Sequence, residues 1–299
     1  MTDVIDGNAV AAEIRDDLSD AISTLERQGT VPGLATVLMS DDPASETYVS
    51  MKQRDCEEVG IDGIHVELDT DAPADELYET IAELNGDDDV HGILVQSPLV
   101  EQVNEREAFR AVAPAKDVDC FHPENVGRMV AGPSHARFKP CTPHGILKLL
   151  DHYDVETEGA EAVVVGRSNI VGTPMANLLA QDDETGNATV TVCHSRTENL
   201  EAHTKTADIV VAAVGVPEFI DGTMLKEGAT VIDVGINRVD ADTDTGYELV
   251  GDVEFDSARE VADTITPVPG GVGPMTRAML LWNTVTAASD QTGIDVDLP

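Results

Sequence analysis

Two kinds of apolar pattern alternate along this chain. Between residues 8 and 27, apolar side chains recur every three or four positions, which predicts an amphipathic helix. Residues 34–39 form a short apolar run that is typical of a buried strand. The alternation continues with expected strands at 64–68 and 92–95 and an expected helix at 74–85. A largely parallel sheet covered by helices is therefore predicted for the first part of the chain.

A helix start is marked in the sequence at Asp42. An aspartate that accepts hydrogen bonds from the first turn, followed by Pro43 at the first helical position, is a favoured beginning. Tyr48 and Lys52 then lie four residues apart, so both side chains project from one face of the predicted helix.

The second part of the chain repeats the α/β pattern. Residues 122–154 are mostly helical and contain the predicted crossing between two domains. Four strands and two helices are expected after it, at 162–166, 189–194, 208–214 and 229–234 and at 171–181 and 198–206. A last helix is expected at about 275–289. The predicted fold class is α/β, with two α/β domains and a cleft between them.

The segment from Thr266 to Thr276 combines three glycines with three prolines, Thr-Pro-Val-Pro-Gly-Gly-Val-Gly-Pro-Met-Thr. Glycine allows positive φ and close backbone approach, while proline fixes φ and removes a donor. This pattern indicates a shaped loop that borders a ligand, or a rigid loop that only caps the helix after it.

The charge of the chain is strongly negative. Among 299 residues, 57 are acidic and 18 are basic, for a formal net charge of −39. Such a field repels nucleic acid and anionic membranes, so neither is expected as a partner. Molar salt reduces the Debye length to about 3 Å and removes most of the self-repulsion. We therefore hypothesise a source with a salt-rich cytoplasm.

Several classes of protein are disfavoured by simple features of the sequence. The N-terminal residues lack the basic and apolar regions of a signal peptide, and no apolar run reaches the roughly 18 residues of a membrane span. The cysteines, which are far apart and form no Cys-x-x-Cys pair, favour neither a metal site nor a disulfide framework: Cys56, Cys120, Cys141 and Cys193. A soluble cytoplasmic protein is expected.

A dinucleotide site is predicted where the strand at 162–166 leads into a helix. Gly166 allows a sharp turn and Gly172 allows close approach at the helix start, although their spacing departs from G-x-G-x-x-G. An NAD site usually carries an acidic residue at the end of the following strand. Cationic and hydroxyl donors occupy the region instead, which favours NADP: Arg167, Ser168, Ser195 and Arg196. Either arginine could otherwise pair with a surface carboxylate.

Five segments in the same order give the chain a specific resemblance. They are residues 41–52, 95–99 (Val-Gln-Ser-Pro-Leu), 116–123 (Lys-Asp-Val-Asp-Cys-Phe-His-Pro), 166–174 (Gly-Arg-Ser-Asn-Ile-Val-Gly-Thr-Pro) and 266–276. The set resembles the bifunctional methylenetetrahydrofolate dehydrogenase/cyclohydrolase family and spans nearly the whole chain. The resemblance implies oxidation of 5,10-methylenetetrahydrofolate with NADP, hydrolysis of the product to 10-formyltetrahydrofolate, and a homodimer.

The resemblance also implies a domain division and site residues. Residues 1–121 would form the folate-binding catalytic domain, 122–154 connecting helices, 155–274 an NADP-binding Rossmann-like domain with a parallel sheet, and 275–299 a helix returning to the first domain. Lys52 would be the main catalytic residue, Tyr48 would pack on the aminobenzoyl ring and Asp119 would bind the pterin. The 266–276 loop would border the substrate through Pro269, Gly270 and Gly271, and Ile236 would contact the nicotinamide side.

Gln96 follows the strand at 92–95, so it lies at the carboxyl end of the predicted sheet and could hold Lys52, or only cap the strand. Asp117 is expected to order its loop. Cys120, Ser97 and Val100 depart from the family pattern, which has Gly, Leu and Pro there.

Other functions stay open at this point. They are a monofunctional dehydrogenase, a folate or nucleotide binder without catalysis, an enzyme for a related reduced pterin, and a Rossmann dehydrogenase acting on an amino acid or a shikimate-like acid.

Overall fold

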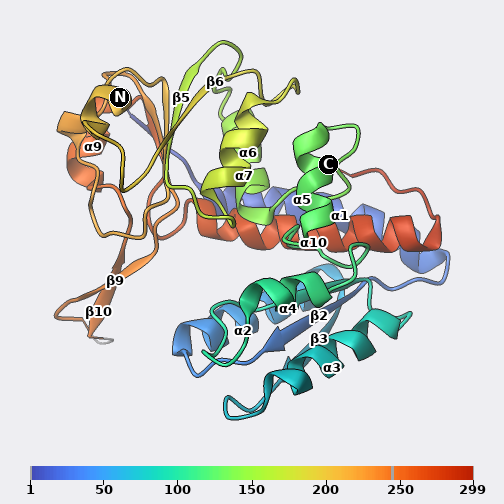
Figure 1. Ribbon diagram of the computed structural model, residues 1–299. Helices are drawn as coiled ribbons and strands as arrows, with labels where there is room; N and C mark the ends of the chain where they lie inside the picture. The colour runs from blue at the N-terminus through green and yellow to red at the C-terminus, as the bar shows by residue number, and fades with distance from the viewer. Residues whose placement is uncertain (1, 244–245, 299) are drawn as a thin grey trace. The chain divides into compact units, whose positions relative to one another are not determined.

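The computed structural model of the protein describes residues 2–243 and 246–298 and contains two compact units. The three-stranded unit comprises Ala12–Met129, Ala136–Cys141 and the chain from Arg277 onward. The six-stranded unit comprises the residues up to Ala11, Val130–His135 and Thr142–Thr276. Each unit has its own parallel sheet, so the predicted α/β class is confirmed (Figure 1).

The sheet of the three-stranded unit has the order β3-β2-β4, and both strand pairs are parallel. Its strands are β2 (Gly33–Leu38), β3 (Asp62–Glu67) and β4 (Gly92–Val95). Its helices include α2 (Pro43–Val59), α3 (Ala74–Gly86) and α4 (Glu105–Ala111), and Figure 1 shows them around the small sheet. Side chains of α3 and α4 share one apolar core with those of β2 and β4. Burial of this core stabilises the unit and holds its strand ends in place.

The predicted start of α2 is confirmed by its cap. The Asp42 carboxylate accepts a hydrogen bond from the Ala44 backbone N–H at 3.0 Å, and Pro43 is the first helical residue. The helix ends where Gly60 adopts a left-handed conformation with φ of 88°. The cap fixes the register of α2, and therefore which of its side chains face the sheet.

The sheet of the six-stranded unit has the order β1-β11-β8-β7-β5-β6, and all its strand pairs are parallel. The strands are β1 (Asp3–Val4), β5 (Glu161–Val165), β6 (Thr189–Cys193), β7 (Ile209–Ala212), β8 (Thr230–Asp233) and β11 (Thr264–Ile265). The helices are α6 (Cys141–His152), α7 (Gly172–Ala180), α8 (Leu200–Thr204) and α9 (Phe255–Val261), with a 3₁₀ turn η1 (Gly222–Met224). The central strands are buried on both faces, as expected for a parallel sheet with helical crossovers.

Three further helices complete the fold. They are α1 (Gly7–Arg27), α5 (Pro123–Ala131) and α10 (Val272–Thr292). The last helix begins three residues earlier than expected, inside the glycine-rich segment, because Pro274 in a first turn lacks only an N–H that has no intrahelical partner. Among residues 2–243 and 246–298 no helix is long and apolar enough to cross a membrane.

Some elements were not predicted. The two-residue strand β1 pairs with β11, so the N-terminal residues join the six-stranded sheet and not the three-stranded one. The antiparallel pair β9 (Asn237–Asp240) and β10 (Tyr247–Val250) forms a separate ribbon, visible in Figure 1. On this ribbon the Arg238 guanidinium lies 4.9 Å from the centre of the Tyr247 ring. These elements are short or polar, so apolar periodicity does not mark them.

Candidate active site

Lys52 and Gln96 meet in the three-stranded unit. Lys52 projects from α2, and its Nζ donates a hydrogen bond to Gln96 Oε1 at 2.9 Å. The Gln96 amide is oriented in turn, because its Nε2 donates to the Ser97 carbonyl oxygen at 2.6 Å. Gln96 is buried and follows β4, at the carboxyl end of the strand. The predicted contact between these two residues is confirmed, and it fixes where the lysine amine lies.

Asp119 contributes a negative charge to the same cluster. Burial lowers the pKa of Lys52, and the Asp119 carboxylate opposes that shift. Burial likewise raises the pKa of Asp119, and the charge of Lys52 opposes it. The Cys141 thiol donates weakly to Asp119 Oδ1 at 3.6 Å. An amine and a carboxylate whose pKa values are both displaced by burial are suited to proton transfer near neutral pH.

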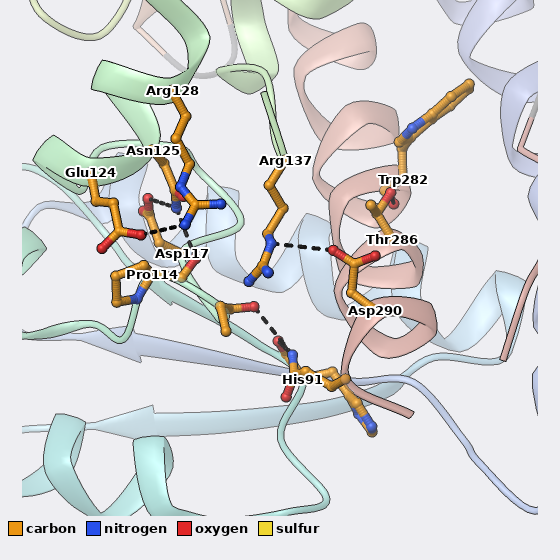
Figure 2. A network of polar contacts seen from close by, with 12 residues as sticks. His91, Pro114, Asp117, Glu124, Asn125, Arg128, Arg137, Trp282, Thr286 and Asp290 are labelled. Atoms are coloured by element: carbon orange, nitrogen blue, oxygen red, sulfur yellow. Dashed lines mark hydrogen bonds and ion pairs between the residues drawn. The ribbon is translucent and has the colours of Figure 1, made fainter. Parts of the chain in front are cut away.

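Asp117 orders the loop that carries Asp119. Its carboxylate accepts hydrogen bonds from the Phe121 N–H at 3.0 Å, the His122 N–H at 2.9 Å and Asn125 Nδ2 at 2.7 Å. Figure 2 shows Asn125 directed at this carboxylate, with the Arg128 and Glu124 side chains paired nearby. Burial raises the pKa of Asp117 to about 7. The expected structural role of Asp117 is borne out by these contacts.

A second support of this loop was not predicted. Asn283 lies on α10, separated by 165 positions from Val118, and its Nδ2 donates to the Val118 carbonyl at 2.7 Å. The same Nδ2 donates to the Lys139 carbonyl at 2.9 Å. One buried amide therefore joins the backbone just before Asp119 to the backbone just before Cys141. No sequence pattern marks such a distant pair.

Cys120 explains one departure from the family pattern. Its φ is 61°, in the left-handed region that favours glycine. The side chain is fully buried, and the thiol donates to the Phe138 carbonyl at 3.4 Å. The buried thiol therefore has an acceptor inside the protein, while the left-handed backbone remains less favourable for cysteine than for glycine. Ser97, a second departure, bonds through its hydroxyl to the Glu105 carboxylate on α4.

Tyr48 lies one helical turn before Lys52 on α2 and is half-buried. Its position on the same face as Lys52 agrees with the predicted spacing of four residues.

The glycine-rich loop belongs to the six-stranded unit, where it packs against the start of α1. A Cβ on Gly7 would lie only 1.8 Å from the Gly271 carbonyl oxygen, so this close approach requires glycine at position 7. Gly270 has φ of 103° and Pro269 is exposed. The hydroxyl oxygens of Thr142 and Thr276 lie 2.9 Å apart and tie the end of the loop to α6. The loop therefore has a defined backbone conformation and exposes Pro269 to solvent.

The turn after β5 requires glycine at two places. A Cβ on Gly166 would lie 2.2 Å from the Ala213 carbonyl oxygen, and one on Gly172 would lie 2.4 Å from the Gly166 carbonyl oxygen. Gly166 also has φ of 137°. The strand end, the start of α7 and the end of β7 thus approach one another more closely than side chains would allow.

The predicted cofactor donors surround this turn. Arg167 and Ser168 follow β5, while Ser195 and Arg196 follow β6, and these adjacent parallel strands end at one edge of the sheet. All four are exposed, and neither arginine forms an ion pair within residues 2–243 and 246–298. The Ser168 hydroxyl accepts the Val171 and Gly172 N–H groups, at 3.1 and 3.3 Å, so it also orders the turn that leads into α7. Exposed guanidinium groups around a glycine turn fit a phosphorylated dinucleotide.

Two buried carboxylates, which were not predicted from the sequence, order the segments that follow β7 and β8. Asp252 accepts hydrogen bonds from three successive N–H groups after β7, at Val214 (2.6 Å), Gly215 (2.9 Å) and Val216 (3.0 Å). Asp233, at the end of β8, accepts the N–H groups of Gly235, Asp252 and Val253, each at 2.9 Å. Ile236, the predicted nicotinamide contact, lies in the turn that they hold and is 47% exposed.

Comparison with known proteins identifies the family. The profile described as tetrahydrofolate dehydrogenase/cyclohydrolase, catalytic domain, matches residues 5–119, and the NAD(P)-binding domain of the same description matches residues 140–292. The chain belongs to this family.

Its relatives are similar over their full length. "Bifunctional protein FolD 1" of Haloarcula marismortui is 69% identical and "Bifunctional protein FolD" of Natronomonas pharaonis 68% identical, each over 100% of both chains. A solved structure of Trypanosoma brucei N5,N10-methylenetetrahydrofolate dehydrogenase-cyclohydrolase (FolD), complexed with NADP cofactor and inhibitor, is 40% identical and covers 97% of this chain and 98% of its own, with a TM-score of 0.93. The tetrahydrofolate dehydrogenase/cyclohydrolase fold is therefore shared from end to end, and haloarchaeal relatives agree with the hypothesis of a salt-rich source.

Proposed function

We propose that this protein oxidises 5,10-methylenetetrahydrofolate with NADP and hydrolyses the methenyl product to 10-formyltetrahydrofolate. Membership of the dehydrogenase/cyclohydrolase family supports both reactions. The observation that carries the assignment of the site is the hydrogen bond from Lys52 Nζ to Gln96 Oε1, beside the carboxylate of Asp119. The reaction serves one-carbon metabolism in the cytoplasm.

In this proposal the three-stranded unit holds the folate. Tyr48 packs on its aminobenzoyl ring, and Asp119 accepts hydrogen bonds from the pterin. Pro269, Gly270 and Gly271 border the substrate from their loop. Positioning by these groups is the main requirement of the oxidation step, because hydride transfer needs alignment more than acid–base help.

NADP, when bound, accepts the hydride at its nicotinamide ring. Arg167, Ser168, Ser195 and Arg196 hold the phosphates and the ribose 2′-phosphate, and Gly166 and Gly172 leave room for the backbone to approach. The turn at Ile236 faces the nicotinamide side.

Lys52 acts in the hydrolysis step. A water oxygen forms a bond to the methenyl carbon, and the water gives up a proton to the lysine amine. The bond from that carbon to N5 then breaks, and N5 takes up the remaining proton of the added hydroxyl, which leaves the formyl group on N10. The lowered pKa of Lys52 favours a neutral amine with a free electron pair, and Gln96 keeps that amine at one place.

The test is an assay in molar KCl with methylenetetrahydrofolate and either NADP or NAD, in which NAD(P)H and the methenyl product are followed separately. We expect NADP to be reduced to NADPH with little accumulation of the methenyl product. Lys52→Met should reduce hydrolysis by about 100-fold or more, the usual scale of acid–base catalysis, and leave NADP affinity within about twofold. Lys205→Met, an exposed lysine paired with Glu201, is the matched control and should change neither.

Accumulation of methenyl product by the unaltered protein would instead identify a monofunctional dehydrogenase. Absence of turnover with either nucleotide would favour another reduced pterin or a binding protein.

We also propose that the protein is a homodimer that binds neither nucleic acid nor membranes. The net charge of −39 supports the absence of anionic partners, because it would repel them. Light scattering in molar KCl tests the dimer, and a mass of one chain would contradict it.

A further inference from the structure

A buried ion pair adjoins the candidate active site. Arg277 Nη1 on α10 lies 2.6 Å from Asp55 Oδ2 on α2, and the two side chains are 17% and 8% exposed. Asp55 lies three residues after Lys52, so both project from neighbouring positions on one face of the helix. The amine of Lys52 is therefore held by Gln96, and the turn of α2 that carries Lys52 is held by the ion pair.

We propose that Arg277, with Asp55 as its partner, is a positioning residue for the cyclohydrolase step, one that anchors the turn of α2 bearing Lys52 and places a fixed positive charge near its amine. This inference rests on the proposed function of Lys52. It adds two residues, separated by 222 positions in sequence, to the apparatus around that lysine.

The charges around Lys52 support a specific role for Arg277. Burial lowers the pKa of Lys52 most strongly, and the Arg277 guanidinium lowers it further. The groups that act in the opposite direction are Asp119, Cys141 and Cys56. Around Asp55 the charged groups are Arg277, Arg15 and Glu58. Arg277 is thus the positive group that counteracts the attraction of Asp119 for the lysine proton.

Burial makes this effect persist in concentrated salt. Exposed charges are screened when the Debye length falls to about 3 Å, whereas a buried pair is screened much less. Desolvation raises the pKa of Asp55, and the bonded Arg277 guanidinium opposes that shift. A chain with 18 basic residues therefore places one of them where salt does not cancel its field.

Two variants separate this role from simple stabilisation. Arg277→Met combined with Asp55→Asn removes both charges without leaving a buried ion unpaired. Asp55→Asn alone keeps the positive charge and removes its counter-charge. Arg137→Met with Asp290→Asn is the control, because it removes another ion pair of α10, with Nε and Oδ2 3.2 Å apart, that acts on neither Asp55 nor Lys52.

The measurement is the pH midpoint for acetylation of Lys52 by acetic anhydride, read by mass spectrometry in molar KCl, since only the neutral amine reacts. We expect the midpoint to move to higher pH in Arg277→Met/Asp55→Asn, to lower pH in Asp55→Asn, and to stay in place in the control. At pH 7 hydrolysis by the double variant should fall about tenfold. The KM for NADP should remain within about twofold.

Midpoints that do not move, or move in one direction in both variants, would overturn the proposal and leave the pair a purely structural contact. If the unaltered protein lacks cyclohydrolase activity, the proposed function fails, but the acetylation midpoints still decide whether Arg277 acts on Lys52.

Discussion

The carboxylate of Asp252 offers a sharp test of how the cofactor side of the six-stranded unit is held together. Asp252→Asn preserves shape but replaces one acceptor oxygen by an N–H donor. Whichever way the amide turns, it must face two N–H groups: those of Val214 and Gly215 at Oδ2, or those of Val216 and Asn237 at Oδ1. Two hydrogen bonds to a charged acceptor are lost, each worth about 1.5–3 kcal/mol.

Part of that loss is recovered, because Gly215 and Val216 are exposed and their N–H groups can bind water. We therefore expect a loss of about 3 kcal/mol in the free energy of unfolding of this unit. For a body of this size, that loss lowers the melting temperature by about 6–12 °C. The KM for NADP should rise more than the KM for the folate, because the disturbed turn follows β7 at the cofactor edge.

The assay is a thermal melt in molar KCl with and without NADP, together with steady-state kinetics. Asp256→Asn, an exposed aspartate in the first turn of α9, is the matched control and should change stability by less than about 0.5 kcal/mol. A melting temperature within about 2 °C of the unaltered protein would refute the reasoning, since it would mean that the turn does not depend on these hydrogen bonds.

Three further results are expected. Transfer from molar KCl to dilute buffer should lower both the melting temperature and the activity, because the net charge of −39 is then unscreened; an unchanged melt would contradict this. Arg196→Ser should raise the KM for NADP about tenfold and leave that for NAD unchanged; equal effects on both nucleotides would exclude a 2′-phosphate contact. As the pH is lowered, the hydrolysis rate should fall because the Lys52 amine gains a proton. Burial lowers the pKa of Lys52, so the midpoint of this fall should lie below pH 10.5, and a midpoint at 10.5 or above would contradict the reasoning.

Much of this fold is predictable from apolar spacing. The helix expected at 8–27 spans Gly7–Arg27, and the strand expected at 92–95 is β4 itself, because long periodic stretches and short buried runs carry their signal locally. By contrast, β1 and β11 have two residues each, and they are defined by pairing with distant strands: β1 with β11, and β11 also with β8. In the ribbon, β9 (Asn-Arg-Val-Asp) has one apolar residue and β10 (Tyr-Glu-Leu-Val) is only four residues long, so no alternation marks it.

The candidate site likewise contains some residues that were predictable from the sequence and others that were not. Gln96 could be placed beside Lys52 because strand ends in a parallel sheet gather at one edge. Asp55 and Arg277 have no such rule, since their contact depends on how two distant helices pack. Asp252 likewise looks like an ordinary acidic residue in a chain that has 57 of them. Burial and hydrogen-bond partners distinguish it, and both are properties of the folded protein.

The four cysteines have a practical consequence for spectroscopy. All are buried, and burial raises the pKa of each thiol, to about 12 for Cys56, so little thiolate forms near neutral pH. Native thiols should therefore resist maleimide reagents while the protein is folded. A cysteine introduced at the exposed position of Asp256 would take up a fluorophore alone, so ligand binding could be followed optically without first removing the natural cysteines.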